Sequence, residues 1–212
     1  MKRGTNHLLI LSTAILALGP PATRADVFNI NSKAAYLHTN NDPTGTFAVP
    51  IDLFSLSFSV SAGDFLQLTR LGDFSERQDP VADDRLFLFA LFSSSTTLLT
   101  ASDLNRLPDA IDAGTDFVSP NTFSGNQPTD IPQDFTVDSG DGVQTNVVIQ
   151  VPTGGRYLFV ATDDTFLGDN SDPDGDFAIQ ISTVPEPPTA LFGVIGVLGL
   201  CFRRKRASKV AA

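Results

Sequence analysis

The run LFLFALF at residues 86–92 is apolar at every position. A strand with one face in water alternates apolar and polar side chains, whereas a strand covered on both faces is apolar throughout. We therefore expect residues 86–92 to form a central strand of a β-sandwich, with protein packed against both of its faces.

On either side of this run, short apolar segments are separated by Gly, Pro, Asn and Asp, which is typical of an all-β domain. Further strands are expected at residues 56–60, 65–71, 147–151, 157–162 and 177–182. The first two flank the turn Ser61-Ala62-Gly63-Asp64, and the next two flank Pro152-Thr153-Gly154-Gly155. Each of these two pairs is therefore expected to form a hairpin.

Two stretches have weaker patterns. Residues 104–113 can hold at most one helical turn, because Pro108 has no backbone N–H to donate. Residues 114–141 are rich in Pro, Asp and Gly and have no periodicity, which favours an ordered surface insertion, with disorder as the alternative. The seventeen Phe residues are expected to supply much of the core, because each buried ring removes a large apolar area from water.

The first 25 residues have the features of a signal peptide. Lys2 and Arg3 precede an apolar, helix-forming stretch at residues 8–18, and small residues at Thr23 and Ala25 fit signal-peptidase cleavage. The apolar stretch is short for a membrane span, so an uncleaved anchor is the less favoured alternative. We expect export, a mature chain that begins near Asp26, and one exported domain at residues 26–183.

The C-terminal end has three parts in a fixed order. The segment Val184-Pro185-Glu186-Pro187-Pro188 is followed by apolar or small residues at 189–202 and by a basic tail at 203–212, which begins with Arg203, Arg204, Lys205 and Arg206. The apolar part is shorter than the roughly 20 residues that a spanning helix needs, which leaves a buried core helix as an alternative. The basic residues are expected to stop transfer and to stay on the cytoplasmic side.

These three parts together resemble the PEP-CTERM sorting tail of Gram-negative bacteria, over about residues 184–207. The resemblance implies that a membrane-embedded exosortase recognises Pro185, Glu186 and Pro187, with Val184 before them. It also implies a single C-terminal transmembrane helix that anchors the chain in the inner membrane before processing. The expected destination is then the cell surface or the extracellular matrix.

Charge limits the partners of the exported part. From Asp26 to Phe202 there are six basic side chains against all twenty-four acidic ones, a net charge of −18. Such a surface repels nucleic acid and anionic lipid and attracts cations. The only cysteine is Cys201, so no intramolecular disulfide can form, and the exported domain must be held by its core or by a metal.

Residues suited to catalysis are scarce. His38 is the one histidine expected to remain after processing, and its polar surroundings favour a solvated surface side chain. The sequence has no Gly-x-Ser-x-Gly motif, no phosphate-binding glycine loop and no His/Cys metal motif. The chain is therefore predicted not to be an enzyme, and a secreted hydrolase built on His38 or on paired Asp residues is the least favoured class.

The densest group of polar residues is the stretch DDTFLGDNSDPDGD at residues 163–176. Carboxylates this close repel one another unless a cation gathers them, and Ca²⁺ accepts six to eight oxygen ligands in flexible geometry. An EF-hand is excluded, because counting from Asn170 places Ile181 instead of Glu at the twelfth position. The alternative is an acidic solvated turn without a specific metal. The candidate Ca²⁺ ligands are Asp164, Asp169, Asn170, Asp172, Asp174 and Asp176.

The Gly63-Asp64 turn, a run of strands, a strand ending in Asp-Asp, a short loop with Gly-Asp-Asn-Ser and a closing strand resemble the galactophilic bacterial lectin family. The resemblance implies a jelly-roll-like β-sandwich in which a loop Ca²⁺ also binds sugar hydroxyls. It assigns Asp164 to the carboxylate that opens the family's loop, and Asp169 and Asn170 to the pair that closes it. The loop here is a couple of residues shorter, so Thr165 has no secure match, and the family's aromatic carbonyl ligand falls near residues 72–74.

The sequence thus predicts an exported, non-enzymatic β-sandwich at the cell surface or in the extracellular matrix. It is expected to bind Ca²⁺ through its acidic loop, and carbohydrate such as exopolysaccharide through Asp164, Asp169 and Asn170. The alternative is a purely structural matrix or surface protein. Sugar binding predicts an exposed aromatic or polar groove beside residues 164–170, whereas a structural role predicts a convex loop.

Overall fold

The computed structural model describes residues 23–37, 48–76, 87–100, 106–114, 123–124, 127–128, 131–164 and 167–184. These residues belong to one compact unit, Thr23–Val184. Residues 1–22 of the predicted signal peptide, residues 185–212 of the predicted sorting tail, Thr165 and His38 lie outside the described residues, so the predictions made for them stay predictions. Across the described ranges, no helix has the length and apolar character that crossing a membrane requires.

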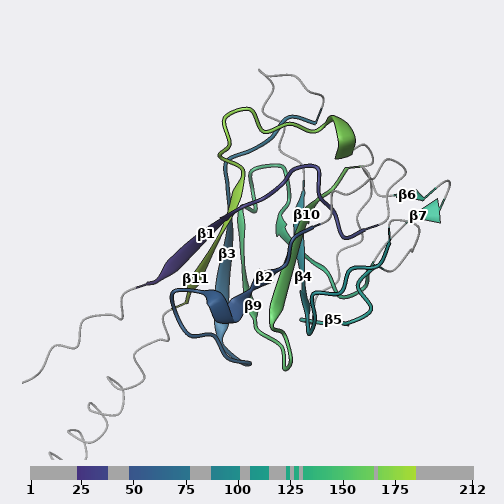
Figure 1. Ribbon diagram of the computed structural model, residues 1–212. Helices are drawn as coiled ribbons and strands as arrows, with labels where there is room; N and C mark the ends of the chain where they lie inside the picture. Colours follow the sequence, from purple (N-terminus) through teal and green to yellow (C-terminus); the bar gives the residue numbers. More distant parts are fainter. Residues whose placement is uncertain are drawn as a thin grey trace, which may run out of the picture. The chain divides into compact units, whose positions relative to one another are not determined.

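Within these ranges the regular secondary structure is nearly all β, in two main antiparallel sheets, which confirms the predicted all-β class (Figure 1). The first sheet has the strand order β1 (Ala25–Asn29), β11 (Ala178–Thr183), β3 (Phe65–Leu71), β9 (Asn146–Gln150). The second has the order β2 (Ile51–Asp52), β10 (Tyr157–Thr162), β4 (Leu88–Ser93), β5 (Ala110–Ile111), and β4 also pairs with β8 (Phe135–Asp138). The smaller elements are the ribbon of β6 (Phe123–Ser124) and β7 (Gln127–Pro128) and the 3-10 helices η1 (Leu53–Ser55) and η2 (Leu167–Asp169).

The strand pairs are nested along the chain. The first strand, β1, pairs with the last, β11, and Ala25 lies opposite Ser182. Moving inward along the sequence, β2 pairs with β10, β3 pairs with β9, and β4 pairs with β8. The chain is therefore a long antiparallel hairpin folded over into two sheets, with its midpoint between β4 and β8.

Strand β4 is buried on both faces, as its composition predicts. Leu88, Ala90 and Phe92 belong to a core that contains residues from both sheets. Phe89 and Leu91, which alternate with them, belong to a second hydrophobic cluster on the other side of the strand. This second cluster includes residues that follow β1 and precede β5 and β8, so loop segments cover the outer face of the second sheet.

Both predicted hairpins are wrong, for one physical reason. Residues 56, 58 and 60 are buried in alternation as expected, but they form no strand, because β3 is already hydrogen-bonded to β11 on one side and β9 on the other. Strand β10 likewise lies between β2 and β4, so the Pro152–Gly155 turn carries the chain from one sheet to the other. The last predicted strand is confirmed by β11, within one residue at each end.

The expectation of a surface insertion at residues 114–141 is wrong for its second half. Strand β8 lies there, and Ile131, Phe135 and Val137 are at most 1% exposed. Asp134 and Asp138 are also fully buried, so the polar composition that suggested a surface segment belongs partly to the interior. Residues 106–113, where one helical turn was allowed, contain a turn and β5.

Candidate metal centre

The candidate site is the loop between β10 and β11, residues 163–177. Its ends are fixed by buried residues. The Asp163 N–H donates to the Phe87 carbonyl at 3.1 Å, and Phe177 lies in the core between the sheets. Between them, η2 buries Leu167 in the second hydrophobic cluster. The described parts of the loop, residues 163–164 and 167–177, are therefore anchored to the core, although most of their side chains are polar.

Three of the predicted ligands come together in this loop. One carboxylate oxygen from each of Asp172, Asp174 and Asp176 lies within 4.8 Å of the other two. The Gly175 N–H donates to Asp172 Oδ1 at 3.0 Å, and Gly175 has a positive φ of 75°, so the Asp-Pro-Asp-Gly-Asp segment turns around these carboxylates. We call Asp172, Asp174 and Asp176 the aspartate cluster. Its hard oxygen atoms suit Ca²⁺, which accepts carboxylates in flexible geometry.

The aspartate cluster rests on the turn that follows β3. The Asp73 N–H donates to Asp176 Oδ1 at 3.2 Å, and Ser75 and Ser171 exchange two backbone hydrogen bonds of 2.8 Å each. Gly72 makes this approach possible, because a Cβ at that position would overlap the carboxylate and the backbone carbonyl of Asp176. The segment at residues 72–74, where the lectin resemblance expects a further carbonyl ligand, thus lies directly against the loop.

The other predicted ligands have different surroundings. Asp164 and Asp169 are not members of the aspartate cluster. Asn170 is fully buried, and its Nδ2 donates to the Ser32 carbonyl at 2.8 Å. The neighbouring Lys33 Nζ donates to the Gly168 carbonyl at 3.2 Å. Asn170 therefore ties η2 to the turn after β1, and its amide group is not exposed to a ligand in solution.

The Oδ1 atoms of Asp169 and Asn170 are buried and find no donor among the described residues. Both are shielded from solvent. Buried polar atoms are nearly always paired, and an exception indicates a bound water or ion, or local strain. The stretch from Asp169 to Asp176 thus combines unpaired buried oxygens with clustered carboxylates.

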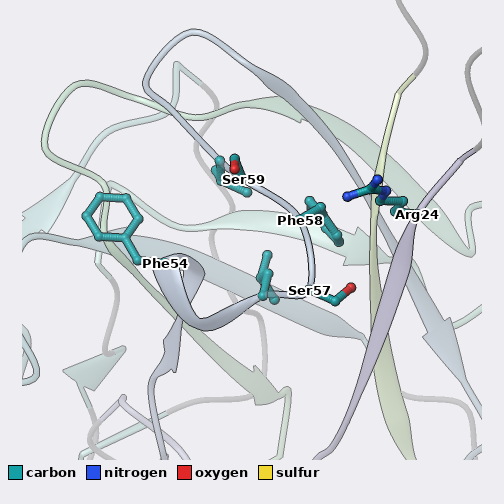
Figure 2. Close-up of a pocket in the computed structure, with 7 residues that line it drawn as sticks. Arg24, Phe54, Ser57, Phe58 and Ser59 are labelled. Atoms are coloured by element: carbon teal, nitrogen blue, oxygen red, sulfur yellow. The ribbon is translucent and has the colours of Figure 1, made fainter.

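A shallow groove of about 330 Å³ lies at the opposite end of the sheets. Figure 2 shows Phe54 and Arg24 at its two ends, with Ser57, Phe58 and Ser59 between them. The Thr183 N–H donates to the Arg24 carbonyl at 3.0 Å, so the groove adjoins the end of β11, whereas the aspartate cluster adjoins its start. Signal-peptide cleavage near Ala25 would remove Arg24 from this groove.

An ion pair supports the exposed Phe54 at the rim. Arg156 donates to the Asp52 carboxylate at 2.9 Å, and its guanidinium lies 5.3 Å from the Phe54 ring centroid. The hydrogen bond from Arg156, together with one from the Phe54 N–H, holds the pKa of Asp52 below its usual value. The same pair raises the pKa of Arg156. These groups therefore keep their charges at neutral pH.

Neither the groove at Phe54 nor a second, smaller hollow among the described residues corresponds to the groove that sugar binding predicts beside residues 164–170. The groove at Phe54 lies at the far end of β11. A smaller hollow of about 100 Å³, near the turn that contacts Asn170, is lined by aliphatic side chains with Asn29 and Asn31, and none of its lining residues is aromatic.

No protein-family model matches the chain, and no curated protein or solved structure matches it either. The function must therefore be argued from the residues themselves. The acidic loop was predicted from the sequence, but its contact with the turn at Gly72 was not. A Gly-Asp pair directly after an alternating strand was the available signal, since such a pair marks a tight turn where another backbone can approach.

Proposed function

We propose that the protein is a non-enzymatic exported β domain whose loop before β11 binds Ca²⁺. The aspartate cluster carries this proposal, since one oxygen from each of three carboxylates lies within 4.8 Å of the others. Three negative charges at this spacing repel one another, and the exported part of the chain already has a net charge of −18. A divalent cation offsets this repulsion, and Ca²⁺ is the metal best suited to such oxygen ligands.

The proposed role of the ion is structural. The loop contacts the turn after β3 through Asp176 and the turn after β1 through Asn170. An ion held by the loop therefore links three segments that are distant in the sequence. The unpaired buried oxygens of Asp169 and Asn170 support a cation in this region.

Calcium is expected to stabilise the folded chain. An ion that binds only the folded state stabilises it by about 2.7 kcal/mol when its free concentration is a hundred times Kd, which corresponds to a rise in Tm of about 5–10 °C for a domain of this size. Asp174→Asn should abolish most of that rise, because Asp174 is an exposed member of the cluster. The measurement is Tm against Ca²⁺ concentration for both chains.

Asp112→Asn is the matched control. Asp112 is also exposed, and its Oδ1 accepts a hydrogen bond from the Gly114 N–H two residues on, so its replacement removes the same charge from a comparable turn. Its Ca²⁺-dependent rise in Tm should equal that of the unchanged chain. No rise in Tm for the unchanged chain, or an equal rise in Asp174→Asn, would count against the site.

The proposed fold type is a jelly roll. Eight strands pair in the nested order described above: β1, β2, β3, β4, β8, β9, β10 and β11. Renumbered 1 to 8 along the chain, with the short β5 left out, they give sheet orders of 1-8-3-6 and 2-7-4-5. This order supports two interlocked Greek keys, the arrangement of double-sheet jelly rolls, which include lectin domains.

Carbohydrate binding at Asp164, Asp169 and Asn170 is less well supported than the structural role. The Asn170 amide is engaged with Ser32 and buried, so it is not positioned to meet a sugar hydroxyl. A glycan array with and without EDTA distinguishes the two roles. The structural role predicts no binding that EDTA abolishes.

The proposed route to the cell surface rests on the sequence of the two ends. Signal peptidase would act near Ala25, and exosortase at the Pro-Glu-Pro motif. Replacing Pro185, Glu186 and Pro187 together by Ala is expected to retain the protein in the inner membrane, which fractionation of the host cell would measure. Lys209→Ala, a change beyond the basic cluster, is the control. Unchanged release of the triple variant to the surface would contradict the sorting role.

A further inference from the structure

The outward face of the four-stranded sheet has an unusual composition. One row across the sheet consists of Val27, Gln180, Thr69 and Asn146, and the next of Ala25, Ser182, Gln67 and Val148. All outward positions of β1, β11, β3 and β9, four strands that lie wholly within the described residues, hold uncharged side chains. Ala178 and Ser182 on β11 are buried among their neighbours, so the exposed part of the face consists of the other positions. We call this surface the neutral face.

Its neutrality contrasts with the rest of the exported chain. The ionisable residues of these four strands, Asp26 and Arg70, lie opposite Ile181 and Ile179, whose side chains belong to the core, so both are on the inner side of the sheet. The chain from Asp26 to Phe202 nevertheless has a net charge of −18. An exposed strand face is an ordinary place for charged side chains, and here they are absent.

The chemistry of the neutral face is that of amides and hydroxyls placed among exposed apolar groups. Val27, Phe65 and Val148 are 52%, 53% and 51% exposed. Between them, Gln67 Nε2 donates to Asn146 Oδ1 across the strands at 3.4 Å, a long hydrogen bond that a competing hydroxyl can replace. Neighbouring strands are about 4.8 Å apart and alternate side chains about 7 Å apart, so the face is a flat grid of donors, acceptors and apolar surfaces.

Charge selects among the partners that such a grid could bind. Anionic polymers and membranes are repelled by the acidic domain, and a second copy of the chain would bring the same net charge of −18 against it. A cationic partner would be drawn to the acidic loops instead of the neutral face. A neutral sugar polymer has hydroxyl groups that pair with amides and apolar C–H surfaces that cover valine and phenylalanine, and it meets no charge repulsion.

We propose that the neutral face binds a neutral polysaccharide chain. This binding does not require Ca²⁺, because the contacting side chains are amides, hydroxyls and apolar groups, and the aspartate cluster lies in the loop before the start of β11. It is therefore distinct from sugar binding through the acidic loop, and its failure would leave the Ca²⁺ proposal untouched.

The test is retention of the full-length chain on immobilised dextran, galactomannan and cellulose, with alginate as the acidic counterpart, all in the presence of EDTA. At least one neutral polymer should retain the chain, and alginate should not. Gln180→Glu keeps the size of the side chain but places a charge in the middle of the face, and should weaken retention about tenfold, because the carboxylate loses the donor group of the amide and is desolvated by the bound sugar. Phe65→Ala should weaken it through loss of apolar contact.

Asn31→Asp adds the same charge at an exposed position off the face and should leave retention within about twofold of the unchanged chain. Tm values for all variants establish that each is folded. Two results would overturn the proposal: no neutral polymer retains the chain in EDTA, or folded Gln180→Glu is retained as well as Asn31→Asp. Concentration-dependent dimers that Gln180→Glu abolishes, seen by sedimentation, would assign the face to a second copy instead.

Discussion

Asp138→Ala is expected to lower the free energy of unfolding by about 3 kcal/mol, the cost of removing one member of a buried ion pair. The Asp138 and Arg70 side chains are 1% and 2% exposed, and Arg70 Nη1 lies 3.9 Å from Asp138 Oδ2. The guanidinium also lies 5.8 Å and 5.3 Å from the ring centroids of Phe74 and Phe177, so it cannot reach water without disturbing both. The measurement is urea denaturation of the variant and the unchanged chain.

Two further variants make this result interpretable. Asp141→Asn, at an exposed carboxylate in the turn just after β8, should leave the urea midpoint unchanged. The double variant Arg70→Met with Asp138→Leu should recover much of the loss, because apolar side chains of similar volume replace both charges. A loss in Asp138→Ala no larger than in Asp141→Asn would show that the ion pair contributes nothing.

Gly72→Ala is expected to cost about 2–4 kcal/mol of unfolding free energy, and to weaken the Ca²⁺-dependent rise in Tm. Two effects add. Gly72 has a φ of +60°, which strains a residue with a Cβ, and that Cβ would overlap the backbone and carboxylate of Asp176. The turn after β3 would have to move away from the aspartate cluster, so stability and metal affinity should fall together. Urea denaturation and Ca²⁺ titration measure the two effects.

Gly114→Ala separates the two effects. Gly114 has a φ of +88°, but a Cβ there would have no neighbour within 4 Å, so only the backbone strain of about 1 kcal/mol remains. Its response to Ca²⁺ should be unchanged. If Gly72→Ala and Gly114→Ala behave alike, the close packing of Gly72 on Asp176 has no energetic importance.

The fold class could be predicted from sequence because strand formation depends on local pattern. The apolar run that contains β4 and the alternation in β3 are properties of a few adjacent residues. Pairing is different, because it depends on which edges remain available. Strands β3 and β10 are each enclosed by partners from distant parts of the sequence, so the short turns beside them could not become hairpins. Strand β8 escaped prediction because it has only four residues, and because its last residue, Asp138, and the residue before the strand, Asp134, are buried carboxylates.

The candidate site was foreseen in composition but not in arrangement. The acidic loop stands out in the sequence, yet only Asp172, Asp174 and Asp176 form the cluster. Asn170 has an amide oxygen that could bind a metal, but its amide nitrogen donates a hydrogen bond to the Ser32 carbonyl. The two residues are 138 positions apart in the sequence, so this contact could not be foreseen. The neutral face was also missed, because each of its strands contributes only a few uncharged residues and the surface exists only when four strands lie side by side.

Strand β11 is the last strand of the domain, yet it lies inside its sheet, between the first strand and the third. During synthesis, Ala25 has no partner until Ser182 has left the ribosome. Closing so long a segment is slow, because its entropy must be lost before any contact compensates. The sheet therefore cannot be completed on a partial chain. A chain whose first strand stays unpaired until its last strand has been made is partly extended during synthesis, and an extended chain is the form that can pass through a narrow channel.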